Sequence, residues 1–186
     1  MTCLVNPELN PDETALFHQI YRRSAEYLAT RGNLPPLAFV RAGVLPRMPG
    51  LTPGGIAIVE MEMPGNDTGK DCMVEVLRQF ARSADADMVV LLLESWMIKP
   101  NEEEARHIQE HGEFLVRPSQ HPNRIEIVLI SVSKPAGQSW SVWVEISRDV
   151  NGCPSIPAEM PTLEYLQNEG RFANILDGNG DQPSLS

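Results

Sequence analysis

The chain has 186 residues, of which 42% are hydrophobic and 22% are charged, and its formal net charge at pH 7 is −10. A chain of this length can bury a hydrophobic core without the help of a metal or a disulfide. The acidic charge and the scattered basic residues argue against nucleic-acid binding, which draws its affinity from clustered Lys and Arg.

Cysteine usage and the N-terminal segment indicate the compartment. Cys3, Cys72 and Cys153 are odd in number, widely spaced and without a C-x-x-C pair, which favours reduced thiols. The opening MTCLVNPELN has neither the basic start nor the apolar stretch of a signal peptide. The longest apolar run, Met88–Leu93, is far shorter than the ~20 residues of a membrane span. We therefore expect a cytoplasmic protein that does not contact a membrane.

The N-terminal part of the chain is predicted to form a helix followed by an irregular connector. Asn10 can cap the helix, Pro11 suits its first position, and Gly32 is placed to end it. Apolar residues recur between them at helical spacing, at Leu16, Phe17, Ile20, Tyr21 and Leu28. Residues 33–55 are rich in Pro and Gly, and we expect a surface connector there, with Leu37–Val40 as an edge strand.

The next segment is predicted to form a β-α-β unit. Ile56–Met63 alternates between apolar and acidic residues, which is typical of a strand with one partly wet face. A helix over Thr68–Ala84, capped by Thr68, then shows an apolar stripe of Met73, Val76, Leu77, Phe80, Ala81 and Ala84. A crossover of this length would make the flanking strands Ile56–Met63 and Met88–Ile98 parallel.

The second half of the chain is predicted to form an antiparallel meander. Met88–Ile98 begins with an unbroken apolar run, which is typical of a strand covered on both faces. The polar segment 101–120 links it to Ile125–Ser133, and a turn at 134–139 leads into Trp140–Ser147.

These elements together predict a single α+β domain over residues 1–186. Its core is a mixed sheet of four to five strands, formed by one β-α-β unit and an antiparallel meander, with an N-terminal helix and a crossover helix. Residues 151–186 are expected to form an irregular extension, with a helical turn or two at 162–168 and a flexible tail over 177–186.

The end of the strand Met88–Ile98 carries the first candidate site. A carboxylate at Glu94, in a covered strand, is costly unless it is paired or hydrogen-bonded. The basic residues expected near it are Arg124, Arg148, Lys99 and His121. One interpretation is an ion pair that stabilises the end of the sheet, and we favour it. The other is a ligand pocket that combines Glu94 with Trp96, His121 and Arg124.

The same residues carry a resemblance. The strand ends in E-[SA]-W-M, and after a charged connector the next strand opens with H-P-x-R-x-E. The matching residues are Glu94, Ser95, Trp96, Met97, His121, Pro122, Arg124 and Glu126. This pattern resembles a set of uncharacterised bacterial proteins. The resemblance implies that the charged connector is a variable loop, and it implies no activity.

The connector itself contains His107, Glu110 and His111 in the order H-x-x-E-H, which resembles the signature of the inverzincin metallopeptidases. On a helix both histidines would share a face and could bind zinc, while Glu110 activates water. The third ligand would come from Glu145, Glu159 or Glu164. A solvated charged helix between two strands accounts for the same residues. We favour that interpretation, expect no metal or cofactor, and keep a zinc hydrolase as an alternative.

Trp143 is the candidate for an interaction surface. It is expected on the opposite strand face from Trp140, Val142 and Val144, where an exposed Trp often marks a contact. Cover by the N-terminal helix is the other interpretation. Because no catalytic constellation stands out, we expect a non-enzymatic accessory or interaction protein that forms a homo-oligomer or binds a protein partner. A small-molecule or enzymatic pocket at Glu94 is the main alternative.

Overall fold

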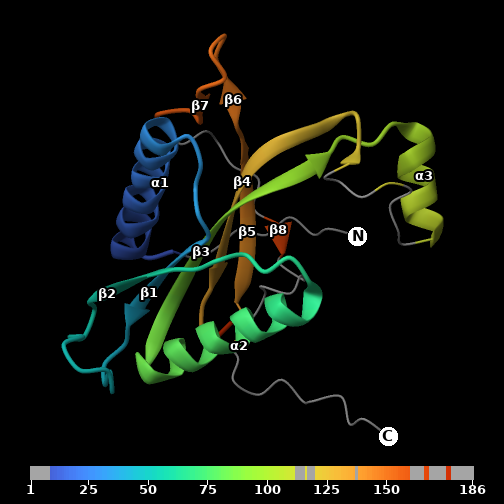
Figure 1. The fold of residues 1–186 in the computed structure, drawn as a ribbon. Coiled ribbons are helices and arrows are strands. Elements are labelled where there is room, and N and C mark those ends of the chain that lie inside the picture. The colour runs from blue at the N-terminus through green and yellow to red at the C-terminus, as the bar shows by residue number, and fades with distance from the viewer. Residues whose placement is uncertain are drawn as a thin grey trace, which may run out of the picture.

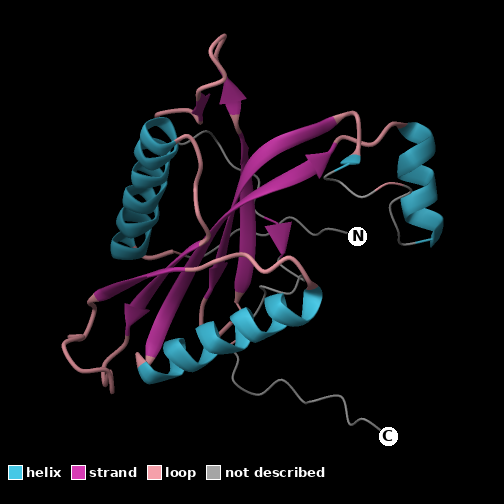
Figure 2. Ribbon diagram, viewed as in Figure 1, coloured by secondary structure: helices cyan, strands magenta, loops and turns pink. Residues whose placement is uncertain are grey.

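The computed structural model describes residues 9–111, 116, 120–136, 138–159, 166–167 and 175–176 (Figures 1 and 2). The helices are α1 (Pro11–Arg31), α2 (Asp67–Ser83) and α3 (Glu102–His111). The main strands are β1 (Leu37–Ala42), β2 (Ile56–Glu60), β3 (Ala86–Ile98), β4 (Arg124–Ser133) and β5 (Ser139–Glu145). Three two-residue strands follow, β6 (Ser147–Arg148), β7 (Pro154–Ser155) and β8 (Leu166–Gln167). The predicted α+β class is confirmed.

The strands form one sheet in the order β2-β1-β3-β4-β5-β8, and β6 and β7 pair separately. The expected meander of β3, β4 and β5 is present. The crossover from β2 through α2 to β3 is also present, and its two strands run in the same direction. They do not pair, because β1 lies between them and is antiparallel to both. Leu37–Val40, expected at an edge, is therefore interior, and the expected mixed sheet is antiparallel at each described ladder.

Helix α1 packs on one face of the sheet. It begins as expected, with Asn10 as cap and Pro11 at its start, and a capping box joins Asn10 to Glu13. Gly32 ends it in the left-handed conformation, with φ of 78°. The apolar side of α1 contacts alternate residues of β3, β4 and β5, and the Phe17 ring meets the Trp140 ring edge-on at 5.3 Å. This core lies on one side of the central strands.

Helix α2 covers the opposite face (Figure 2). Its cap is Asn66, whose side chain accepts a hydrogen bond from the backbone of Gly69, and not Thr68 as expected. The buried face of the helix contains Val74, Leu77 and Ala81. Val76, predicted to lie in the apolar stripe, is 65% exposed. Since the helix pitch places Val74, Leu77 and Ala81 on one side, Val76 turns to solvent.

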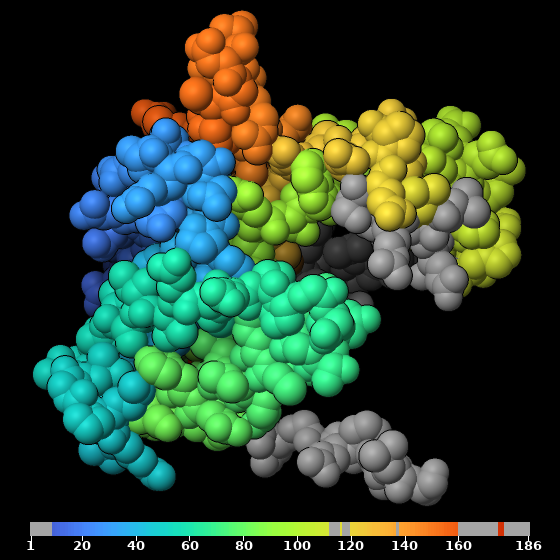
Figure 3. Space-filling view, in the orientation of Figure 1, coloured from blue at the N-terminus to red at the C-terminus, as the bar shows by residue number. Residues whose placement is uncertain are grey.

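The run Met88–Leu93 at the centre of β3 is buried at each residue, as expected for a strand with a helix on either face. Helix α3 stands apart from this body at the far end of β3 (Figure 1), and none of its residues is buried. In Figure 3 the segment around β6 and β7 projects from the surface, and Val150 there is fully exposed. The predicted helical turn at 162–168 lies outside the described residues except for 166–167, which form β8, and the predicted tail over 177–186 lies outside them entirely.

Candidate functional site

The end of β3 and the start of β4 bring the predicted site residues to one end of the sheet. The ladder places Trp96 opposite Glu126 and Ile98 opposite Arg124. Because side chains alternate along a strand, Glu94 and Trp96 share the sheet face of Leu92, which α1 covers further along. The site therefore begins where the cover of α1 ends.

Glu94 lies directly after the buried run and is exposed. One of its carboxylate oxygens accepts a hydrogen bond from the backbone N–H of Leu34, at 2.6 Å, in the segment that follows α1. Partial burial raises the pKa of Glu94, and the charge of Glu126 adds to this, while the Leu34 N–H and the charge of Arg148 oppose it. The hydrogen bond that the structure shows for Glu94 thus comes from a backbone amide.

Trp96, His121 and Arg124 line one open hollow of about 530 Å³ beside this position. The guanidinium carbon of Arg124 lies 4.6 Å from the centre of the Trp96 ring, in a cation–π contact. Arg148 and Glu126 also line the hollow and pair with each other at 2.7 Å. Glu94 is not among the described residues that line the hollow. Three of the four predicted pocket residues therefore come together, and Glu94 lies outside them.

His121 connects this hollow to α3. It is 5% exposed, and its Nε2 lies 2.7 Å from a carboxylate oxygen of Glu104. Its Nδ1 lies 3.1 Å from the backbone N–H of Asn123 and accepts that hydrogen bond. The second contact assigns the Nδ1 lone pair as acceptor, so the ring proton sits on Nε2 and points at Glu104. Glu104 also completes a capping box with Asn101 at the start of α3, so one carboxylate joins the helix to the sheet.

The H-x-x-E-H residues lie on α3 as the zinc hypothesis requires, where His107 is half-buried and Glu110 and His111 are exposed. The rings of His107 and His111 stack at 4.2 Å. Of the proposed third ligands, Glu145 pairs with Lys99 at 3.5 Å, and Glu164 is outside the described residues. Within the described part of the chain, no three His, Cys, Asp or Glu side chains gather where they could hold a metal ion.

Trp143 is half-buried on the α2 side of β5, opposite Leu129 of β4. This places it on the other sheet face from α1, so α1 does not cover it. Larger exposed fractions occur elsewhere among the apolar residues, notably at Ile58, which is 64% exposed. Ile58 of β2 is therefore a more exposed apolar side chain than Trp143 of β5.

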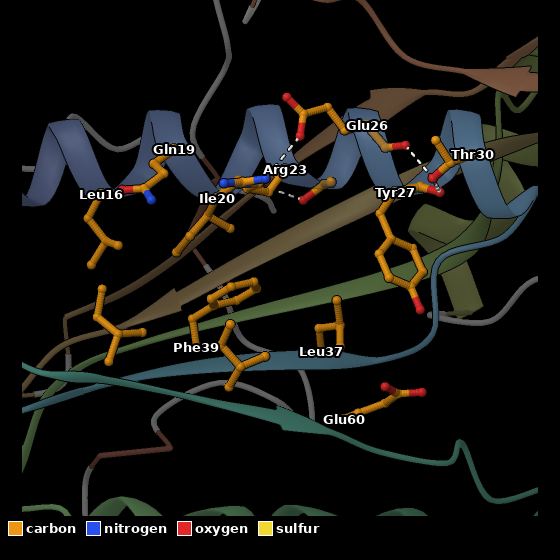
Figure 4. Close-up of a pocket in the computed structure, with 13 residues that line it drawn as sticks. Leu16, Gln19, Ile20, Arg23, Glu26, Tyr27, Thr30, Leu37, Phe39 and Glu60 are labelled. Carbon is orange, nitrogen blue, oxygen red and sulfur yellow. Dashed lines mark hydrogen bonds and ion pairs between the residues drawn. The ribbon is translucent and has the colours of Figure 1, made fainter. Parts of the chain in front are cut away.

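A groove of about 740 Å³ runs between α1 and the edge strand β2 (Figure 4). Its floor is apolar and its rim is polar. The floor includes Leu37, Phe39, Ile56 and Ile58, and the rim includes Gln19, Arg23, Glu26 and Glu60. Ile56 is 43% exposed and Ile58 is 64% exposed. Sequence reasoning missed this groove because it depends on β2 being the outer strand, which follows only from the insertion of β1. One sign of the groove was present in the sequence. Ile56 and Ile58 lie on the same strand face as Glu60, and that face was expected to contact water.

A second feature that the sequence did not reveal is a buried charge cluster at the start of α1. Glu13 is 3% exposed, and its two carboxylate oxygens meet Arg41 and Lys134, each at 3.0 Å. Arg41 in turn contacts Asp87 at 2.6 Å. Burial alone would raise the pKa of Glu13, but hydrogen bonds from Lys134, the Asn10 amide and Arg41 outweigh it and hold that pKa below its ordinary value. The cluster joins α1 to three parts of the sheet.

Comparison with models of protein families, with curated proteins and with solved structures finds no significant match. The resemblance through E-S-W-M and H-P-x-R-x-E therefore stays a prediction. No helix among the described residues combines the length and the apolar character needed to cross a membrane.

Proposed function

We propose that this chain is a non-enzymatic interaction module, and that it binds a protein partner in the groove between α1 and β2. The observation that carries the proposal is Ile58, an isoleucine 64% exposed in the middle of an edge strand and on the floor of that groove. Removing apolar surface from water is favourable by about 25 cal/mol per Å², and part of this gain offsets the entropic cost of association. An apolar patch with a polar rim is the usual form of a protein contact surface.

A photo-crosslinking amino acid at position 58 tests this proposal. Incorporated in place of Ile58 in the cells that produce the protein, it should yield an adduct with another polypeptide on illumination. Val76 on α2 is the matched control, because it is an apolar residue with a nearly equal exposed fraction of 65%. An adduct at 58 and none at 76 supports the proposal. Equal adducts at both positions, or none at either, would contradict it.

We place the module in the cytoplasm of a bacterial cell, which the cysteine usage and the sequence resemblance support. Cys72 and Cys153 are free and exposed, a state that a reducing compartment preserves. Trapping thiols with an alkylating reagent in intact cells should label both residues. Recovery of either one as a mixed disulfide would count against this location.

A second candidate function is the binding of a small molecule in the hollow at Trp96. It is supported by the convergence of Trp96, His121 and Arg124 on one cavity, with a cation above an aromatic ring. Fluorotryptophan NMR offers a direct test, because the chain has three tryptophans and each gives one resonance. Titration with a panel of small carboxylates and phosphates should shift the Trp96 resonance and leave Trp140 in place. No shift at millimolar ligand would remove this candidate.

A further inference from the structure

Strand β2 has an outer edge whose polar backbone groups can be assigned from the hydrogen bonds of its inner edge. The Met61 amide donates to the Pro36 carbonyl at 2.9 Å, and the Ala42 amide donates to the Gly55 carbonyl at 2.8 Å. In an antiparallel ladder the residues alternate between facing the partner strand and facing away from it. Gly55, Ala57, Val59 and Met61 therefore face β1. The N–H and C=O groups of Ile56, Ile58 and Glu60 point outward.

The side chains of β2 are mostly apolar. In the described sheet β2 has β1 as its neighbour on one side, and its outer edge is unpaired. The strand reads Ile-Ala-Ile-Val-Glu, so it has no proline or lysine to discourage the addition of another strand. At the other end of the sheet, the described outer strand, β8, has two residues. The β2 edge thus offers three outward residues for pairing beside an apolar groove.

We infer that a second copy of the chain occupies this edge, with β2 and its symmetry mate joined as antiparallel strands about a twofold axis at Ile58. This inference rests on the proposed interaction function and names its partner. In this register Ile58 pairs with Ile58 of the other copy, and Ile56 pairs with Glu60. All three outward residues of each strand then enter the ladder, with about six backbone hydrogen bonds across the axis.

Charge selects the twofold register. Glu60 is the one charged residue of β2. Centring the axis on Ile58 places each Glu60 opposite an isoleucine, and the two glutamates then lie about 14 Å apart along the strand. That distance exceeds the screening length of about 8 Å at physiological salt. A register shifted toward Glu60 would place the two carboxylates directly opposite each other, which destabilises a strand pair.

The groove side chains agree with the same symmetry. A twofold axis normal to the sheet keeps α1 of both copies on one face, so the two grooves open toward each other above the joined strands. Ile56 and Ile58 of each copy would then be partly covered by the same two residues of the other copy. A self-complementary patch of this kind is the defining property of a twofold interface. Because each strand contributes only five residues, we expect a concentration-dependent dimer and not an obligate one.

Amide hydrogen exchange and mass determination on the full chain test the inference together. Sedimentation should show the mass rising from 20.7 kDa toward twice that value with concentration. The amide of Ile58 should exchange at least about tenfold more slowly in the concentrated sample than in the dilute one. The amide of Val59 faces β1 and should be protected at both concentrations, which makes it the internal control.

Substitution sharpens the test. Ile58→Lys should weaken the dimer at least about tenfold, because lysine at an edge strand opposes pairing. Val76→Lys is the matched control and should leave the mass unchanged, and circular dichroism of both variants checks the fold. If Ile58→Lys fails to fold, the exchange of Ile58 in the unmodified chain still decides the question.

The remaining outcomes overturn the inference in distinguishable ways. A doubled mass without protection of Ile58 would place the dimer on another surface. A constant mass of 20.7 kDa at all concentrations would exclude the second copy. In that case, a photo-crosslinked adduct at position 58 with a different protein would still support the proposed interaction function. Absence of both results would remove the two proposals together.

Discussion

Both ends of the β3–β4 ladder gather charged side chains, but the Glu13 cluster at one end is more deeply buried than the Arg148–Glu126 pair at the other. Where β3 begins and β4 ends, Glu13 is 3% exposed and is shared by Arg41 and Lys134. Where β3 ends and β4 begins, the side chain of Arg148 is 41% exposed in its pair with Glu126. A buried charge depends on its partners, whereas an exposed one can replace them with water. The first end should therefore contribute more to the stability of the fold than the second.

Removal of the buried carboxylate of Glu13 should have the largest effect and tests the difference between the two ends most directly. Glu13→Ala leaves Arg41 and Lys134 facing each other and removes half of the α1 capping box. We expect the free energy of unfolding to fall by about 3 kcal/mol, measured by urea denaturation. Arg148→Ala is the control at the exposed end and should lower the free energy of unfolding far less, because solvent screens that pair. Similar losses in the two variants would show that burial does not separate the ends.

Acid should weaken the buried end. The folded-state pKa of Glu13 is held below its ordinary value of 4.5. Its stabilising contribution is therefore present above pH 4.5 and is lost as pH falls through the lowered pKa. Glu13→Gln, which does not titrate, should show a smaller decrease in urea midpoint than the unmodified chain over the same acid range. An identical pH profile in the two proteins would argue that Glu13 is not paired in solution.

A double-mutant cycle between Trp96 and Arg124 measures the contact at the exposed end. The Cζ–ring distance of 4.6 Å predicts a coupling of about 0.5–1 kcal/mol in the free energy of unfolding. The cycle uses Trp96→Ala, Arg124→Ala and the double variant. Strictly additive effects would mean that the cation does not rest on the ring in solution.

Glu94 should respond to pH in the opposite direction from Glu13. Its folded-state pKa is raised, so its favourable contribution is present below pH 4.5 and is lost as pH rises through the raised pKa. Glu94→Gln keeps an oxygen that can accept from the Leu34 amide and removes the charge. We expect this variant to be slightly more stable than the unmodified chain at pH 7, by less than about 0.5 kcal/mol, because the group is exposed. Chemical unfolding at pH 7 and pH 4 would check it, and a loss of stability at pH 7 would contradict it.

The smallest effect is expected at α3. Zinc added to the full chain should not raise the thermal midpoint, because within the described residues no third ligand lies beside His107 and His111. His107→Ala combined with His111→Ala provides the comparison. A zinc-dependent rise in the midpoint that this double variant abolishes would revive the zinc hydrolase alternative.

Local features were predictable from the sequence because they depend on neighbours along the chain. The start of α1 at Asn10 and Pro11 and its end at Gly32 follow from capping chemistry within a few residues. The unbroken apolar run Met88–Leu93 likewise predicts a strand that is covered on both faces of the sheet, and these residues are buried. Errors arose where two local choices were nearly equal. Asn66 and Thr68 can both cap α2, and Val74 and Val76 both fit a helical stripe.

Features that depend on distant pairing could not be predicted. Glu13 meets Arg41 and Lys134, which lie 28 and 121 residues further along the chain. The apolar groove exists because β1 displaces β2 to the edge, and no short-range pattern indicates that insertion. Trp96, His121 and Arg124 were predicted to converge because a meander places them at adjoining strand ends. Glu94 was grouped with them because it shares a strand face with Trp96. In the structure its carboxylate instead accepts a hydrogen bond from the backbone of the segment after α1.

The insertion of β1 between β2 and β3 also bears on how the chain reaches its native state. The β1–β2 hairpin and the β3–β4–β5 meander each pair segments that are adjacent in sequence, so each can form from local encounters. Among the described strands they join through β1 and β3, in pairs such as Val40 with Val89, after α2 has crossed the sheet. Closing such a distant pair has an entropic cost before its contacts compensate for it, which slows folding. Docking of the two halves along β1 and β3 is therefore the expected slow step of folding. Until this docking is complete, the edge of β3 that later pairs with β1 stays open to pairing with other strands.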